Sequence, residues 1–526
     1  MKMVKSLILG SAAGLVAMSG AQAADLPVKA KAVEYVRICS LYGAGFYYIP
    51  GTDTCIKLGG YLRVDVLANT NSDATGNTSG AGGANNRFTN GYTWRSREDL
   101  NIDTRTATEY GVVRTFADLT FSWTSDTYAG QGNGTTLYGP IGTTAAPNNA
   151  GSGAVAGGTL GVYYAFIQFA GFTMGKAVSQ FSTPWQNYPG NNFDGLVGGG
   201  GTVTGVNQFS YTADFGNGVS GTLSAQDPTA YYQAAVANLG VTGTFGTTQQ
   251  LSTFGTSDFA GTMAPDFVGM IRVDQAWGLF QASFAAHNNR AAYNHSAIPA
   301  ISGSELAGHP DDKWGWAAQL ALSIKNIPTG AGDTINVQGV YTDGATRYNI
   351  QDLAGFAGAN TIFGGTNNPF AYQSVGFGIA PDTVFVAGGQ QQLIQTWGMR
   401  GAYTHNWNPY WNSSVYGAFA AVMYNGNAKT LLCGVNGVGG SLRGGFGNGI
   451  IGCNPDYNIG QIGFITRWTP VKNLTFSGDV TFTGLDQKFF GTVVLPATTS
   501  IGKPGATYEL KDQNTVTLLL RAQRNW

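Results

Sequence analysis

The stretch YGVVRTFADLTFSW, residues 110–123, decides the fold, because apolar and polar side chains alternate along it with a period of two. The apolar set is Val113, Ala117, Leu119, Phe121 and Trp123. The polar set is Arg114, Asp118, Thr120 and Ser122. Successive side chains of a β-strand point to opposite faces, so this stretch predicts a half-buried strand with one apolar and one polar face.

The same alternation recurs along the chain, for example in GGYLRVDV (59–66) and in LTFSGDVTF (474–482). It does not distinguish an apolar face that meets a protein core from one that meets lipid. Sixteen strands are predicted, at 57–68, 91–104, 109–124, 159–169, 172–177, 206–215, 219–226, 267–275, 278–287, 313–325, 332–342, 396–406, 411–424, 459–468, 473–483 and 507–526.

The connections between these strands alternate between short and long. Short ones include AG at 170–171 and NWNPY at 406–410, and long ones, rich in Gly, Asn, Thr and Ser, include 125–158 and 343–395. Short turns at one end and long loops at the other are typical of outer-membrane barrels. Hydrocarbon offers no hydrogen-bond partners, so a membrane-spanning sheet must close on itself. The expected fold class is therefore all-β, a 16-stranded antiparallel transmembrane β-barrel with short periplasmic turns, long extracellular loops and a lumen wide enough to hold water.

The beginning of the sequence has the pattern of a secretory signal peptide. Residues 1–23, MKMVKSLILGSAAGLVAMSGAQA, contain two lysines, then an apolar run, then a small-residue Ala-Gln-Ala site. The alternative, a membrane anchor, would need a longer apolar run. We therefore expect three parts: a cleaved signal peptide at 1–23, an N-terminal segment at 24–56, and the transmembrane barrel at 57–526.

Composition excludes several classes of protein. Glycine accounts for 78 of 526 residues, charged residues for only 11%, and the formal net charge is −1. The mean hydropathy of −0.05 lies between that of a helical membrane protein and that of a highly charged soluble one. A net charge so close to zero gives no support for binding to nucleic acid.

The four cysteines form two close pairs in the sequence, Cys39 with Cys55 and Cys433 with Cys453. In a secreted chain this spacing predicts two disulfides and an oxidising compartment. The alternative, zinc ligation, lacks both CxxC spacing and nearby histidines.

Three stretches resemble the alphaproteobacterial general porins of the Brucella matrix-porin type. They are ADLPVKAKAVEYVRICSLYGAGFYYIPGTDTCIKLGGYLRVDV (24–66), RSREDLNIDTRTATEYGVVRTFADLTF (95–121) and FIQFAGFTMGKAVSQF (166–181). The resemblance implies a homotrimer of sixteen-stranded barrels in the cell outer membrane of a Gram-negative bacterium, each with an inward-folded third loop. The expected function is passive diffusion of small hydrophilic solutes and ions. The expected partners are outer-membrane lipid, lipopolysaccharide and the barrel assembly machinery.

The last predicted strand places Trp526 on the lipid side. Val516, Leu518 and Leu520 share its parity, whereas Thr517, Arg521 and Gln523 face the lumen. The resemblance implies that Trp526 is the signal read by the assembly machinery. A second interpretation, compatible with the first, is a residue of the aromatic belt at the periplasmic interface.

The candidate functional residues would form a constriction, because a porin sorts solutes by the width and electric field of its narrowest part. The basic residues that face the lumen by parity are Arg63, Arg95, Arg97, Arg114 and Arg521. Asp194, in the third loop AVSQFSTPWQNYPGNNFDGLVGGGGTVTG (177–205), is the candidate opposing charge. The alternative is that these arginines only pair with acids on their own wall, which are Asp65, Asp99, Asp103 and Asp118.

Glu98 breaks the pattern, because it shares parity with Trp94 and Leu100 on the lipid face. A charge facing lipid at mid-membrane costs on the order of a few kcal/mol. Either a bulge resets the strand or Glu98 lies in a subunit interface, and we favour the interface.

Signatures of enzymes are absent from the sequence. The four histidines show no metal-ligand spacing, and the glycine runs lack the lysine and helix of a phosphate-binding loop. We therefore expect no catalysis, no cofactor and no metal. Two alternatives to a general porin remain open. One is a sugar-specific channel in which Trp185 and Tyr188 form a sliding track, and the other is an adhesin or surface enzyme that uses the barrel as an anchor.

Overall fold

The computed structural model describes residues 37–70, 86–87, 92–124, 159–185, 190, 196–199, 204–229, 232–239, 256–295, 300–350, 360–434, 449–497 and 502–526. The chain divides into two compact units, residues 1–56 and 57–526. The predicted signal peptide at 1–23 lies outside the described residues.

The described part of the first unit is a small disulfide-bonded segment. Cys39 and Cys55 are bonded, with their Cα atoms 6.1 Å apart, as predicted. Both half-cystines and Phe46 are buried together. A two-residue strand, β1 (Tyr47–Tyr48), pairs with the beginning of β2, with Tyr48 opposite Cys55. The disulfide and this short pairing therefore hold the same turn of chain.

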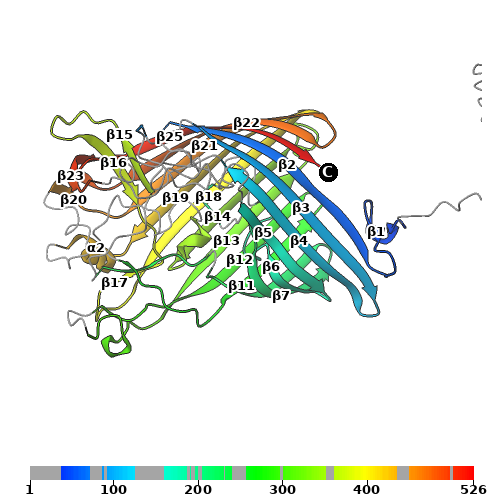
Figure 1. Cartoon of the computed structure of the whole chain (residues 1–526), viewed down its shortest axis with the longest axis horizontal. Coiled ribbons are helices and arrows are strands. Elements are labelled where there is room, and N and C mark those ends of the chain that lie inside the picture. Colours follow the sequence, from blue (N-terminus) through cyan, green and yellow to red (C-terminus); the bar gives the residue numbers. More distant parts are fainter. Residues whose placement is uncertain are drawn as a thin grey trace, which may run out of the picture. The chain divides into compact units, whose positions relative to one another are not determined.

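The second unit is a closed barrel of sixteen strands (Figure 1). Each barrel register that the structure gives is antiparallel, and closure comes from β2 pairing with β25, for example Arg63 opposite Gln523. The predicted 16-stranded antiparallel β-barrel is confirmed. The strands are β2 (Cys55–Asn69), β3 (Thr93–Thr108), β4 (Gly111–Thr124), β5 (Thr159–Phe169), β6 (Phe172–Ala177), β7 (Val206–Gly216), β8 (Val219–Gln226), β11 (Asp266–Gln275), β12 (Gly278–Asn289), β13 (Lys313–Lys325), β14 (Thr334–Asp343), β18 (Gln392–Asn408), β19 (Trp411–Tyr424), β21 (Tyr457–Val471), β22 (Leu474–Gln487) and β25 (Gln513–Asn525).

The long connections carry secondary structure of their own. A five-stranded sheet forms in the order β15-β16-β24-β23-β20, and in Figure 1 its strands and α2 gather at the end of the barrel away from the hairpin turns. Among the described residues, no helix is both long and apolar enough to cross a membrane. The loop elements are β9 (Val236–Asn238), β10 (Thr256–Ser257), β15 (Asn360–Gly364), β16 (Gln373–Gly378), β17 (Thr383–Phe385), α2 (Gly426–Cys433), β20 (Ile450–Gly452), β23 (Phe490–Leu495) and β24 (Ala506–Leu510).

The two faces of the barrel wall follow the predicted alternation. On β3 and β4, Asp99 and Thr120 lie opposite each other and are each 2% exposed, whereas Phe121 on the other face is 48% exposed. Most outward side chains of these strands are apolar and most inward side chains are polar, which suits a wall between lipid and water.

At the loop ends of β19 and β21 the inward side chains are apolar as well. Ala420, Val422 and Ile459 are at most 1% exposed and pack with side chains of the long loops, including Phe377 and Val493. The long loops thus form an apolar core of their own against this part of the inner wall. This core was not among the features predicted from the sequence.

Candidate functional site

One wall of the lumen carries most of the predicted site residues. We call it the arginine wall, and it consists of the inward-facing charged residues of β25, β2, β3 and β4. Two more guanidinium groups than carboxylate groups lie on it. Its members are Arg63, Arg95, Arg97, Arg105, Arg114, Arg521, Asp65, Asp99, Asp103 and Asp118.

Asp65 is the centre of the first charge cluster on this wall. Its carboxylate lies 2.6 Å from Arg521 Nε and 2.8 Å from Arg95 Nη2. Arg63 Nε is 3.4 Å away, and the Asp65 side chain is fully buried. One carboxylate therefore lies among three guanidinium groups, so the formal charges of these four residues sum to a positive value.

A second cluster lies around Asp103. Arg114 Nη2 donates to Asp103 at 2.9 Å and Arg105 Nη2 at 3.0 Å. Arg114 Nη1 also donates to Gln168 on β5 at 2.9 Å. The side chains of Arg105 and Arg114 are 30% and 28% exposed, compared with 8% for Arg95, so this cluster is the more accessible to solutes.

The remaining predicted arginine, Arg97, makes a different set of contacts. Its Nε donates to the Ser122 hydroxyl at 2.7 Å, and its guanidinium carbon lies 5.3 Å from the centre of the Tyr163 ring. All five predicted arginines thus lie on one wall, and the pairing with Asp65 and Asp103 is also present. Arg105 was missed because the predicted strand ended at residue 104, although its parity matches that of Arg97.

The third loop is fastened to the far side of the barrel by glutamines. Gln281 Nε2 on β12 donates to the carbonyl oxygens of Phe181 and Ser182, at 3.3 and 3.1 Å. Gln319 Nε2 on β13 donates to the same Phe181 carbonyl at 2.9 Å. Gln338 on β14 accepts a hydrogen bond from the Thr183 hydroxyl, also at 2.9 Å. In the strand order, β12 to β14 are half-way round the barrel from β2.

The second half of the same loop contacts β18 and β21. The Val197 N–H donates to Gln461 Oε1 at 3.0 Å, and Arg400 Nη1 donates to the Leu196 carbonyl at 3.3 Å. Gly198 has a positive φ of 88°, and a Cβ there would collide with the Met399 carbonyl. Glycine is therefore required where the loop passes against β18. Arg400 is a site residue that the sequence analysis missed.

Phe181 anchors the loop in an apolar cluster inside the barrel. Its ring lies 4.7 Å from that of Tyr348, which stacks on Tyr232 at 4.0 Å. Small inward side chains of the wall, such as Ala285 and Ala317, make room for this cluster. Alanine at these positions of β12 and β13 thus explains why the loop can lie flat against the wall.

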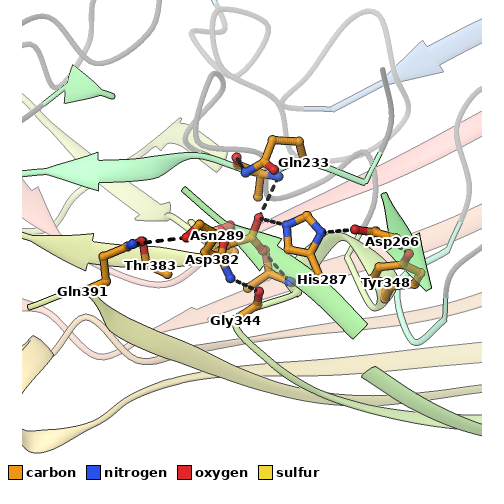
Figure 2. Close-up of polar contacts among 12 residues, drawn as sticks. Gln233, Asp266, His287, Asn289, Gly344, Tyr348, Asp382, Thr383 and Gln391 are labelled. Atoms are coloured by element: carbon orange, nitrogen blue, oxygen red, sulfur yellow. Dashed lines mark hydrogen bonds and ion pairs between the residues drawn. The ribbon is translucent and has the colours of Figure 1, made fainter. Parts of the chain in front are cut away.

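A buried histidine joins two further long loops to the same wall. His287 on β12 lies between two carboxylates, with Nδ1 2.7 Å from Asp266 and Nε2 3.5 Å from Asp382 (Figure 2). Asp382 also accepts hydrogen bonds from the backbone N–H groups of Thr346 at 2.7 Å and Ala234 at 2.8 Å. The loops that contain Ala234 and Asp382 are therefore tied to β12 through one carboxylate.

The structure leaves several predictions untested. Asp194 and Tyr188 lie outside the described residues, so neither the opposing charge nor the sliding track can be placed. Glu98 lies opposite Phe121 in a β3–β4 register that runs without a shift, which argues against a bulge between these two strands. Trp526 is 52% exposed and its N–H donates to the Gly60 carbonyl at 3.1 Å.

The second predicted disulfide is also present. Cys433, at the end of α2, is bonded to Cys453, just after β20, with Cα atoms 5.7 Å apart. Both half-cystines pack against the apolar core formed by the long loops. The disulfide therefore ties α2 to the loop sheet.

Comparison with known proteins places the chain among porins. A family model described as "Porin subfamily" matches residues 25–519. Porin Omp2b of Brucella abortus (strain 2308) is 34% identical over 278 residues, which cover 52% of this chain and 63% of Omp2b. Porin Omp2a of Brucella ovis is 38% identical over 230 residues, which cover 42% of this chain and 59% of Omp2a. The matched segments thus span less than two thirds of these curated relatives.

A solved structure shares the fold. The outer membrane channel DcaP of Acinetobacter baumannii aligns with 91% of this chain and 99% of its own, with a TM-score of 0.51 and 16% sequence identity. At this identity the likeness concerns the barrel fold alone.

Proposed function

The chain belongs to the porin family whose model matches residues 25–519, and from this premise we propose that it forms a water-filled channel for passive diffusion of small hydrophilic solutes and ions. The observation that carries the proposal is the arrangement of the lumen. A wall with excess guanidinium groups lies half-way round the barrel from the strands that hold the third loop. Solutes would pass between the two.

The arginine wall would supply the electric field of this passage. Arg105 and Arg114, with side chains 30% and 28% exposed, would carry the most accessible charge, whereas Arg63, Arg95 and Arg521 converge on buried Asp65. Asp194 on the loop would be the opposing charge. A transverse field between acid and base orients polar solutes and water, and disfavours apolar ones.

The proposal includes the setting of the channel. The barrel is a multi-pass protein of the outer membrane, made with a signal peptide at 1–23 that is removed. It would assemble as a homotrimer, with Glu98 in a subunit contact, and Trp526 would be read by the barrel assembly machinery. Lipid and lipopolysaccharide would cover the remaining outer surface.

The test is single-channel recording of the refolded protein in a planar bilayer under a KCl gradient. Arg97→Glu combined with Arg114→Glu should shift the reversal potential toward cation selectivity, because two positive charges of the wall become negative. Lys325→Glu, at the barrel rim where the lysine is 44% exposed, is the matched control and should shift it less. A wild-type protein that conducts no KCl would refute the channel. An unchanged reversal potential in the double variant would remove both arginines from the constriction.

A further inference from the structure

Aromatic rings project into the lumen beside the exposed arginines. Phe116 on β4 and Phe166 on β5 lie opposite each other on the inward face, and both are only half-buried. The lumen of an outer-membrane barrel is normally polar, because its side chains face water. Two partly exposed phenylalanines there are an exception that lipid contact cannot explain.

The rings and the second charge cluster form one surface. We call it the aromatic ledge, and it consists of Asp103, Arg105, Arg114, Phe116 and Phe166. The guanidinium carbon of Arg114 lies 5.0 Å from the centre of the Phe116 ring and 5.5 Å from that of Phe166. The two ring centres are 5.4 Å apart, with the planes inclined by 32°.

The charge of the ledge favours an anion. Arg105 and Arg114 both pair with Asp103, and the formal charges of these three residues sum to +1. The Nε–H of Arg114 donates to both oxygens of Asp103, one N–H of Nη2 donates to Asp103, and one N–H of Nη1 donates to Gln168. A guanidinium has five N–H groups in a planar fork that matches a carboxylate, so Arg114 retains donors for a solute.

We propose that the aromatic ledge is a binding site in the channel for aromatic monocarboxylates, with the carboxylate on Arg105 and Arg114 and the ring against Phe116 and Phe166. This inference rests on the proposed function and names a class of solute for it. The ring of the solute would stack on rings already held in place, which favours binding beyond the burial of apolar area. Aliphatic acids lack this contact, and aromatic cations would be repelled by the arginines.

A competing explanation is purely structural. The phenylalanines could only shield the ion pairs between Asp103 and the two arginines from water. That role requires no solute, and it predicts that an aromatic and an aliphatic carboxylate behave alike in the channel.

The experiment measures inhibition of the KCl current through the wild-type channel in a planar bilayer by benzoate, acetate and benzylammonium at constant ionic strength. Benzoate should halve the current at a concentration about two- to tenfold lower than acetate, the factor that corresponds to one aromatic contact. Benzylammonium should be no more effective than acetate. Equal half-blocking concentrations of benzoate and acetate would overturn the inference while the KCl current still supports the channel. No KCl current at all would overturn both.

Variants locate the site. Phe116→Leu combined with Phe166→Leu should remove the preference for benzoate and keep the KCl conductance, because the ion pairs with Asp103 remain. Phe284→Leu, on the outward face of β12 where the ring is 49% exposed, is the matched control and should keep the preference. If the double variant does not fold, each single variant should weaken the effect of benzoate in part. A folded variant that retains the full preference would overturn the assignment to the ledge.

Discussion

The arginine wall and the wall opposite it are built on the same strand pattern but hold different inward side chains. Both expose phenylalanine to the outside, Phe121 on β4 and Phe284 on β12. Inside, the first carries guanidinium and carboxylate groups. The second, which we call the glutamine wall, carries Gln281, Gln319 and Gln338 on three consecutive strands.

The difference shows how one fold makes two kinds of inner surface. A carboxamide can donate and accept hydrogen bonds without carrying charge, so it can be buried at moderate cost once it is paired. The three glutamines are at most 2% exposed, and they bind the third loop or one another. Arg105 and Arg114 keep nearly a third of their side chains in water. The charged wall therefore remains a surface for solutes, whereas the amide wall becomes a support for a loop.

The largest expected effect on stability comes from a substitution of Asp65, at the centre of the arginine wall. Asp65→Asn should lower the free energy of unfolding by about 3–5 kcal/mol, because it leaves three guanidinium groups close together without their shared, fully buried carboxylate. The measurement is denaturant unfolding of the barrel in lipid vesicles. Asp274→Asn removes an exposed partner of Lys325 and should cost only about 0–1 kcal/mol. Equal losses in the two variants would mean that Asp65 is not the centre of the charged wall.

The next effect concerns the loop core that covers the inner wall at β19 and β21. Replacing Cys433 and Cys453 with serine opens a loop of twenty residues, and the chain-entropy model then predicts a loss of about 3 kcal/mol. Hydrogen exchange of α2 should accelerate, while exchange in β3 and β4 stays as it was. The corresponding double serine variant at Cys39 and Cys55 should leave α2 unchanged. Faster exchange in β3 would mean that the loop core also stabilises the arginine wall.

The third prediction tests the glutamine wall directly. Gln281→Leu combined with Gln319→Leu removes three hydrogen bonds to the carbonyls of Phe181 and Ser182. Each carbonyl left without a partner costs about 1–3 kcal/mol. The third loop should then leave the wall more often, and the single-channel conductance should become larger and noisier. Gln390→Leu, at an exposed loop position, should leave the conductance unchanged. If the double glutamine variant has the same conductance and noise as the wild type, the apolar contacts of Phe181 are sufficient to hold the third loop on the wall.

Period-two alternation was enough to predict the strands and the charged wall. All sixteen barrel strands appear, with ends that move by up to six residues. The largest shift is in the strand predicted at 507–526, because β24 of the loop sheet takes its first part and β25 begins at Gln513. The parity that placed Arg97 and Arg114 in the lumen also explains Arg105, once β3 is extended to Thr108. Both disulfides followed from the spacing of the cysteines. These features depend on neighbours along one or two strands, which a sequence displays.

The glutamine wall could not be predicted in the same way. Gln281, Gln319 and Gln338 are far apart in the sequence, and only the barrel brings them under one loop. The apolar core of the long loops has the same origin, because Phe377, Val493 and Val422 are far apart in the sequence and share one cluster only in the folded barrel. Long-range packing of irregular segments leaves no period to detect. The one available signal was Ala and Val at inward positions of β12, β13 and β19, where a lumen facing water would have polar residues.

The smallest expected effect lies at the short-turn end of the glutamine wall. Asp333, in the turn between β13 and β14, is buried and accepts a hydrogen bond from the Asn406 N–H at 2.9 Å. His405 Nδ1 lies 2.7 Å away, and the hydroxyls of Thr329 and Tyr403 donate at 2.7 and 3.1 Å. Burial by itself would raise the pKa of Asp333, but the hydrogen bonds outweigh it, and the pKa lies well below the usual range.

The sign of the pH dependence follows from this lowered pKa. A carboxylate with a lower pKa in the folded than in the unfolded state stabilises the fold above the unfolded value of about 3.9, and this contribution is lost as the pH falls below it. The stability difference between the wild type and Asp333→Asn should therefore be constant from pH 7 to 5 and should shrink toward pH 3, which denaturant midpoints at each pH would show. Asp274→Asn, at an exposed ion pair, should show no such change. A stability difference between the wild type and Asp333→Asn that stays constant down to pH 3 would contradict this prediction. It would mean that the backbone of β14 and β18 holds the turn, and that the charge of Asp333 is unimportant on this wall even outside the membrane.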